Sequence, residues 1–510
     1  MTAQAAGAGA SVLGALGLLA FGLAPLPLAA AGCGAYVVAV VSRPWLAVPL
    51  IVLTLPFHLQ PRAFLGIEMS AAEVAILLGA AAVLGRGVIE RLRAAGKAGL
   101  WTRSPQPSPW GIRGGQPAVQ LPAPSPVDWG VAAFLLAGFL SLLVTEYPRQ
   151  SLRELRWLIV EPVLVFYIVR ATMAGAAQAV IALWCIVTAG LVAAAAALLG
   201  LGAQGSLLDP FARAAFPYLS PNHLGLFLGR AGAVALAIAL FWPKGGSLLS
   251  SDEGGSHAAY PSAQGRAAQG REDPERTRPN DRVPARALGW IALAMLLPAL
   301  AKTISFGAWL GFGAAALAVA GLMGRRWAAA VAAGLAAAVV LALVVLPAER
   351  TTGRLDPASG TGLFRLQIWE ASMRMLADHP VLGIGLDNYL YRYRGAYMLP
   401  EAWEEPDISH PHNWMLDFWL QLGALGLMAA LALLGWSAVV AGRMLARRAS
   451  PEDRLIGAAA LGLLVDTLVH GAVDYSYFLV DAAVLWWITL GVLAARSSRI
   501  APVTAIGTPL

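Results

Sequence analysis

The sequence predicts an all-α polytopic membrane protein with about 12–14 transmembrane helices and one large extracytoplasmic loop, residues 348–412. Hydrophobic residues fill 58% of the 510 positions, and charged residues fill only 13%. A soluble chain carries roughly twice that charged fraction. Apolar runs long enough to cross a bilayer recur along the chain. The net charge of +7 is concentrated in particular loops, which indicates membrane topology rather than nucleic-acid binding.

Hydropathy places about fourteen spans, of which the first three are short enough to be two. They are residues 9–24, 26–41, 45–59, 70–89, 128–145, 155–172, 176–201, 222–242, 287–301, 303–323, 327–347, 413–441, 455–474 and 478–496. Basic residues gather in loop 90–127, at Arg325 and Arg326, in loop 442–454, and after the last span. All four groups then lie on one side, which the positive-inside rule makes cytoplasmic, together with both termini.

Polar segments divide the chain into membrane blocks. Residues 1–89 hold the N-terminal helices, 90–127 a cytoplasmic Pro/Gly-rich linker, 128–243 further helices, 244–286 a disordered cytoplasmic loop, 287–441 the helices around external loop 348–412, and 442–510 the C-terminal helices and tail. The two linkers lack the large apolar residues needed to offset chain entropy. Cys33 and Cys185 lie in apolar runs, so the sequence predicts no disulfide framework.

The external loop contains one predicted amphipathic helix, about residues 361–378. Phe364 (or Leu366), Trp369, Met373 and Leu376 recur at spacings of three and four, which gives one apolar face. Pro380 ends this helix.

The junction between this loop and span 413–441 carries His410, His412 and Asn413. A helix N-terminus presents free N–H groups and a partial positive charge, which favour a phosphate or a developing oxyanion. A neutral histidine there can accept a proton from a hydroxyl nucleophile. The alternative is that these side chains, with Trp414 and Trp419, are interfacial anchors.

Three arginines precede span 155–172. Arg149, Arg153 and Arg156 are spaced four and three apart, so they share one helical face. Three guanidinium groups can clamp a diphosphate. The alternative is contact with lipid headgroups, or pairing with Glu146 and Glu154.

Several ionisable residues lie inside the predicted spans. Arg230 is a functional candidate by default, and Glu161 or Asp466 are its expected partners if the pair is structural. Asp466, His470 and Asp474 repeat every four residues and form one polar stripe. The stripe is either a carboxylate–histidine relay or a set of interhelical hydrogen bonds that fixes the bundle.

Several motifs are absent from the sequence. It has no Gly-Lys-Ser/Thr phosphate loop, no Asp-x-Asp or clustered Cys/His metal motif, and no Gly-x-Ser-x-Gly elbow. We therefore expect neither a metal nor a cofactor. Histidine as base and arginine as charge clamp suit attack of a sugar hydroxyl on a diphosphate-activated glycan.

These residues resemble the O-antigen ligase and polymerase superfamily. The signature is His412-Asn413, nine residues, Gly423, two residues, and Gly426-Leu427. Further similar features are Pro221-Asn222, Ser305-Phe306-Gly307-Ala308-Trp309, Thr352-Gly353-Arg354, Arg365, Trp369, Pro380, Gly383-Ile384-Gly385 and Asn388. The family often has arginine where Phe306 stands, and Lys302 is the nearby cation.

The resemblance implies an inverting, metal-independent membrane glycosyltransferase. Such an enzyme moves a glycan from an undecaprenyl-diphosphate-linked donor to a lipid-core, polysaccharide or protein acceptor on the outer face of the bacterial plasma membrane. His412 would be the catalytic histidine, with His410 beside it. The expected substrate-binding residues are Arg149, Arg153, Arg156, Asn222, Arg230, Lys302, Arg354, Arg365 and Asn413, with Asp466, His470 and Asp474 in support.

Two other interpretations stay open. A transporter or flippase for a polar or anionic solute, or for a lipid-linked glycan, would use Arg230 and Asp466 along a pathway through the membrane. A non-catalytic assembly subunit would tolerate loss of His412. The depth of the essential groups in the membrane distinguishes a transporter from an enzyme, because a transferase gathers these groups at one face. The acceptor decides among ligase, polymerase and protein O-oligosaccharyltransferase.

Overall fold

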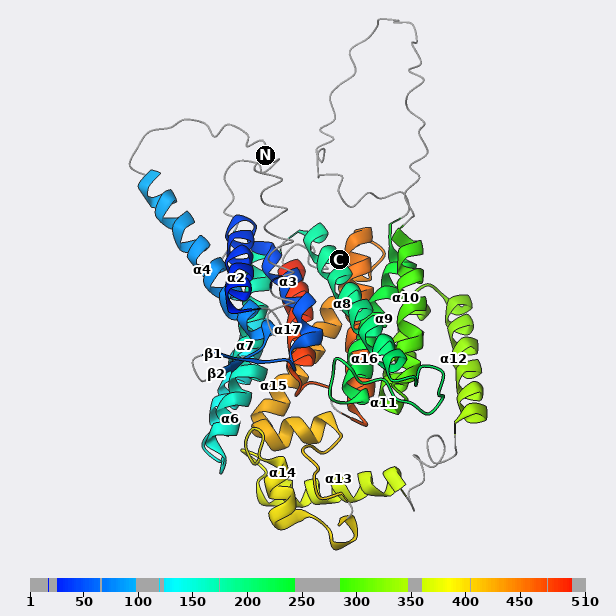
Figure 1. The fold of residues 1–510 in the computed structure, drawn as a ribbon. Coiled ribbons are helices and arrows are strands. Elements are labelled where there is room, and N and C mark those ends of the chain that lie inside the picture. The colour runs from blue at the N-terminus through cyan, green and yellow to red at the C-terminus, as the bar shows by residue number, and fades with distance from the viewer. Residues whose placement is uncertain are drawn as a thin grey trace, which may run out of the picture.

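The computed structural model describes residues 17, 25–64, 67–97, 119, 123–173, 175–243, 285–346, 360–403, 405–474 and 476–497. In this part the chain is a helical bundle with one small antiparallel hairpin, β1 (Arg62–Phe64) and β2 (Ile67–Met69) (Figure 1). Eight of the described helices are long and apolar enough to cross a membrane. The predicted all-α polytopic fold is therefore confirmed.

The long apolar helices are α4 (Ala71–Lys97), α8 (Ala176–Ala203), α9 (Pro221–Phe241), α10 (Ala285–Lys302), α12 (Arg325–Val345), α15 (Trp414–Met444), α16 (Pro451–Gly471) and α17 (Val480–Ser497). Shorter apolar segments are α2 (Leu26–Ser42), α3 (Ala47–Thr54) between the turns η1 (Pro44–Leu46) and η2 (Leu55–Phe57), α5 (Pro126–Ser141) and α11 (Phe306–Gly321). The predicted span 9–24 and most of both linkers lie outside the described residues.

One helix begins earlier than the predicted span 155–172. It runs without a break through α6 (Pro148–Glu154), the π-helical turn η3 (Leu155–Val160) and α7 (Glu161–Thr172). Pro148 occupies the first turn, where its missing N–H and fixed φ are tolerated. The arginines at 149, 153 and 156 are therefore part of the same helix as the apolar segment.

The centre of the bundle is α9. It packs against α8, α10, α11 and α16, and its apolar window is wholly buried. Small residues permit this packing: a Cβ on Gly232 would lie 2.9 Å from Cε2 of Phe312. Close backbone approach through glycine and alanine is a main source of helix association in a bilayer. By contrast, α12 lies at the edge of the bundle in Figure 1 and buries no residue.

The segment between α12 and α15 covers one end of the bundle (bottom of Figure 1). It holds α13 (Gly360–Asp378), α14 (Tyr389–Arg392), the π-helical turn η6 (Tyr393–Tyr397) and the 3₁₀ turn η7 (Pro400–Ala402). The predicted helix 361–378 is confirmed as α13. Its predicted apolar face was only partly right, because Leu376 is buried whereas Leu366 and Met373 are exposed. Its buried face, with Ile368 and Met375, forms a small apolar cluster with Tyr389, Tyr393 and Leu420.

This segment docks into a break in α15. Gly423 has φ +69°, so the helical hydrogen bonding is interrupted there. The amide of Ala424 instead donates to the carbonyl of Val381 over 2.9 Å, and the amide of Ile384 donates to Leu420 over 2.7 Å. Backbone groups freed inside an apolar region need such partners. The break explains why glycine stands at 423 in the signature.

Candidate active site

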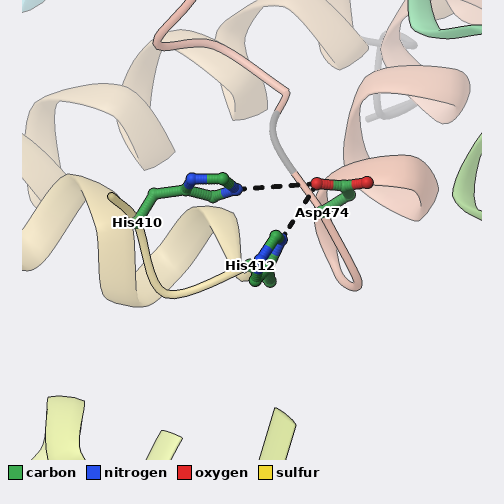
Figure 2. A group of neighbouring side chains, drawn as sticks. All are labelled: His410, His412 and Asp474. Carbon is green, nitrogen blue, oxygen red and sulfur yellow. Dashed lines mark hydrogen bonds and ion pairs between the residues drawn. The ribbon is translucent and has the colours of Figure 1, made fainter. Parts of the chain in front are cut away.

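His412 and Asp474 form a hydrogen-bonded pair at this end of the bundle (Figure 2). His412 is the second-last residue before α15, and Asp474 follows the end of α16. Nδ1 of His412 lies 3.0 Å from Oδ1 of Asp474. Because a carboxylate only accepts, Nδ1 carries the proton and Nε2 keeps its lone pair. The His412 side chain is 22% exposed and that of Asp474 only 5%, so the histidine is the member that solvent and substrate can reach.

Two features hold the segments that carry this pair together. Asn413 caps α15, since its side chain accepts from the amides of Met415 and Leu416 at 3.1 and 3.3 Å. Its Nδ2 also donates to the carbonyl of Ala472 over 3.4 Å, which ties the start of α15 to the residues after α16. His412 itself has φ +51°, in the left-handed region that a non-glycine residue rarely adopts. Strained backbone of this kind clusters at functional sites.

His410 approaches the same carboxylate oxygen beside His412 (Figure 2). Its Nε2 lies 3.6 Å from Oδ1 of Asp474, and its ring lies edge-to-face against His412 with centroids 4.0 Å apart. Nδ1 of His410 is 3.1 Å from Oγ of Ser409. Burial, and then the neighbouring His412, lower the pKa of His410 to about 3.

Asp474 stays ionised at neutral pH. Burial alone would raise its pKa, but the interactions with His410 and His412 outweigh burial and hold the pKa well below the usual aspartate value. The site therefore contains one buried carboxylate anion beside a neutral His410. Such an anion stabilises the imidazolium that forms when His412 takes up a proton.

A second chain of hydrogen bonds reaches the other carboxylate oxygen. Asn222, at the start of α9, donates from Nδ2 to Oδ2 of Asp474 over 2.9 Å. Its Oδ1 accepts from Nη2 of Arg213, also at 2.9 Å, and Nε of Arg213 donates to the carbonyl of Thr303 over 2.9 Å. Asn222, a candidate substrate-binding residue from the sequence, thus contacts the carboxylate directly. Arg213 was not predicted, because an isolated loop cation has no pattern that marks it.

Histidines on two further helices lie near Asp474. His223, next to Asn222, is within electrostatic range of Asp474 and His412, and His470 near the end of α16 is within range of Asp474. His470 also packs on α11, where its Cδ2 would lie 2.8 Å from a Cβ on Gly307. His223 was missed by sequence reasoning because it is a single histidine at the start of the apolar span 222–242, with no other histidine near it in sequence.

Arg365 is a predicted cation that experiences the charge of Asp474. It lies half-buried on α13. Burial lowers its pKa, and the negative charge of Asp474 opposes that effect. The same helix holds the loop that carries His410 and His412 (the histidine loop) in place, since Nε1 of Trp369 donates to the carbonyl of Pro411 over 3.0 Å.

The three-arginine face is largely paired with acids. Arg153 bonds Asp387 at 2.9 Å, with Glu154 at 3.7 Å. Arg156 pairs with the buried Glu73 and lies 3.5 Å from Glu161. Arg149 is exposed. Two of these charges are thus already balanced before any anion binds.

The remaining predicted residues contact groups other than the His412–Asp474 pair or lie outside the described residues. Arg230 is buried and donates to the carbonyl of Ser476 over 2.5 Å, with Asp466 at 3.6 Å. Nζ of Lys302 donates to the carbonyl of Asp209 over 2.6 Å. Arg354 lies outside the described residues.

The His410, His412 and Asp474 donor atoms all lie within 4.8 Å of one another, so this group can hold a metal ion. No sequence motif indicated it, because Asp474 comes from a segment 62 residues away from His412.

Comparison with known proteins places the site in context. Residues 291–431 match a family model described as O-antigen ligase. A protein of Rickettsia conorii (strain ATCC VR-613 / Malish 7), to which its name ascribes polysaccharide ligase activity, is 26% identical over 137 residues. That match covers 25% of this chain and 29% of the relative. The matched family region contains His410, His412 and Gly423, whereas Asn222 and Asp474 lie outside it. The resemblance inferred from the sequence is confirmed, since residues 291–431 match the O-antigen ligase family model.

Proposed function

We propose that the protein is a membrane glycosyltransferase that moves a glycan from an undecaprenyl-diphosphate-linked donor to an acceptor hydroxyl on the outer face of the bacterial plasma membrane. The observation that carries the proposal is the His412–Asp474 pair. It leaves Nε2 of His412 with a free lone pair at a partly exposed position, as a general base requires.

In the proposed reaction, Nε2 of His412 accepts the proton of the acceptor hydroxyl. The oxygen lone pair forms the new bond to the anomeric carbon, and the bond from that carbon to the diphosphate oxygen breaks. The bonding pair leaves with the diphosphate. Asp474 stabilises the imidazolium. Attack opposite the leaving group inverts the anomeric carbon, as the family resemblance implies.

Arg365 is the proposed diphosphate partner. It lies on the helix that holds the histidine loop, and it experiences the charge of Asp474. A guanidinium can bond two phosphate oxygens at once. The paired state of Arg153 and Arg156 makes them weaker candidates for the same task, since binding there would require an acid to be displaced.

The alternative transporter interpretation needs charged groups along a pathway. Arg230 and Asp466 instead face each other in the bundle interior, with side chains only 2% and 0% exposed. This arrangement is that of a structural pair, which supports the enzyme proposal.

The test is turnover in detergent solution, where no compartments exist. The purified chain, mixed with a lipid-diphosphate-linked oligosaccharide and a glycan acceptor, should release the lipid diphosphate and extend the acceptor. No turnover with any acceptor, together with donor movement across liposomes, would favour the transporter. Surface glycans of a deletion strain then identify the subclass: accumulated full-length lipid-linked glycan indicates a ligase, and accumulated single repeat units indicate a polymerase.

A further inference from the structure

We propose that His410, His412 and Asp474 form a Zn²⁺ site, and that zinc bound there inhibits the transferase. The three donor atoms are contributed by the loop before α15 and the turn after α16. The inhibition rests on the proposed function of His412, whereas the binding site itself does not.

The geometry already approaches that of a tetrahedral site. Zinc binds imidazole nitrogen and carboxylate oxygen at about 2.0–2.2 Å, so adjacent ligand atoms of a tetrahedron lie roughly 3.3–3.6 Å apart. Oδ1 of Asp474 lies 3.0 Å from Nδ1 of His412 and 3.6 Å from Nε2 of His410. These two distances bracket the tetrahedral value, and the third pair of atoms is within 4.8 Å. Small ring rotations would complete the set.

The chemistry of the donors selects zinc over magnesium or calcium. Two imidazoles and one carboxylate are a recurrent catalytic zinc set, which leaves a fourth position for water. Magnesium and calcium prefer oxygen ligands in larger number. The single negative charge of Asp474 leaves the zinc complex with a net positive charge, which a diphosphate or water can approach.

Neighbouring side chains hold the proposed ligands in orientation. Nδ1 of His410 lies 3.1 Å from Oγ of Ser409, so its Nε2 is the nitrogen turned to the carboxylate. Oδ2 of Asp474 is held by Asn222 at 2.9 Å, which keeps Oδ1 directed at both rings. Partners of this kind fix the ring orientation and the tautomer of metal-binding side chains.

Zinc would remove the base by changing the tautomer of His412. Coordination at Nδ1 requires that this nitrogen give up its proton, and the neutral imidazole then carries the proton on Nε2. Nε2 is the atom that accepts the acceptor proton in the proposed reaction. A zinc-bound His412 therefore cannot act as the base, and the hydrogen bond to Asp474 is lost.

The binding test is direct and independent of turnover. The full chain in nanodiscs is stripped with EDTA and titrated with ZnCl₂ by calorimetry. We expect one saturable site, an affinity at least about tenfold weaker in His410→Gln, and wild-type affinity in His379→Gln, a control directly after α13 that is not one of the three ligands. Equal affinity in His410→Gln and wild type, or no saturable site, would overturn the proposal.

Cobalt provides a second readout that needs no variant. Co²⁺ in the stripped wild-type protein should give the intense visible absorption of a four-coordinate site, which Zn²⁺ then abolishes. The weak spectrum of six-coordinate cobalt would overturn the tetrahedral site. In turnover assays Zn²⁺ should inhibit and EDTA should restore activity, whereas Mg²⁺ should have no effect. Saturated binding without inhibition would overturn the inhibitory role alone. An active His412→Ala would overturn the proposed base, but it would not bear on zinc binding by the wild-type protein.

Discussion

Nδ1 of His412 and Oδ1 of Asp474 lie 3.0 Å apart, although 62 residues separate them in the chain. The contact forms because the first residues of α15 lie beside the last residues of α16. Asn413 ties these two helix ends together through its hydrogen bond to the carbonyl of Ala472. The pair gives His412 a defined tautomer.

Variants of Asn222 can distinguish a positioning role from substrate binding. We expect Asn222→Ala to lower kcat about tenfold with little change in donor KM, because it removes a hydrogen bond to Asp474 but no substrate contact. Asn222→Asp should lose more activity, since it places a second carboxylate beside Asp474. Steady-state kinetics on both variants provide the test. A rise in KM at unchanged kcat would instead assign Asn222 to the substrate, as the sequence alone suggested.

Arg365 is expected to act on donor binding. Arg365→Ala should raise the donor KM about tenfold or more, because one charge-assisted contact to a diphosphate is lost. Arg374→Ala is the matched control: it lies on the same helix, is 58% exposed, and pairs with Glu370 at 2.7 Å. Donor titrations of the two variants are compared with wild type. Equal KM values in all three proteins would remove Arg365 from the proposed diphosphate site.

His410 should make stability depend on pH. Its folded pKa is lowered to about 3, whereas the unfolded value is about 6.5. Between these values the unfolded chain binds a proton that the folded chain does not, so stability falls as the pH is lowered from about 6.5 toward 3. The limiting slope is about 1.4 kcal/mol per pH unit. Thermal unfolding in detergent at several pH values should show a shallower slope in His410→Gln, and identical slopes would refute the assignment.

Gly423 should be the most sensitive glycine in α15. A Cβ there would lie 2.4 Å from the carbonyl oxygen of Val381, and φ is +69°. We expect Gly423→Ala to cost at least about 2 kcal/mol of stability, with loss of turnover as the segment between α12 and α15 detaches. Gly435→Ala is the control, because a Cβ there meets nothing within 4 Å, and it should be neutral or stabilising by up to about 1 kcal/mol. Equal melting temperatures in the two variants would contradict the docked break.

The sequence predicted the helices better than the tertiary contacts between them. Hydrophobic run length and period identify spans and the helix at 361–378, because burial and bilayer thickness impose them locally. The candidate histidine was found because it stands at a loop-to-span boundary. The role of Gly423 was not visible, since its cause is the carbonyl of Val381, a residue remote in sequence.

The site was only partly predictable for the same reason. Asp474 was recognised as polar within a stripe. Its contacts with His412, His410 and Asn222 form because the turn after α16, the loop before α15 and the start of α9 converge. Spacing along one helix cannot reveal such convergence. The arginine face was recognised from its period, whereas its pairing with Asp387 and Glu73 depends on tertiary packing.

Glycan transfer by the His412→Ala and Asp474→Asn variants tests the central claim most directly. Both should insert and fold like wild type, as judged by expression and melting temperature. We predict that His412→Ala abolishes transfer, and that Asp474→Asn lowers kcat at least about 100-fold, because an asparagine neither fixes the tautomer nor stabilises the imidazolium. An unchanged product ladder in His412→Ala, with intact donor and acceptor in the assay, would contradict the account.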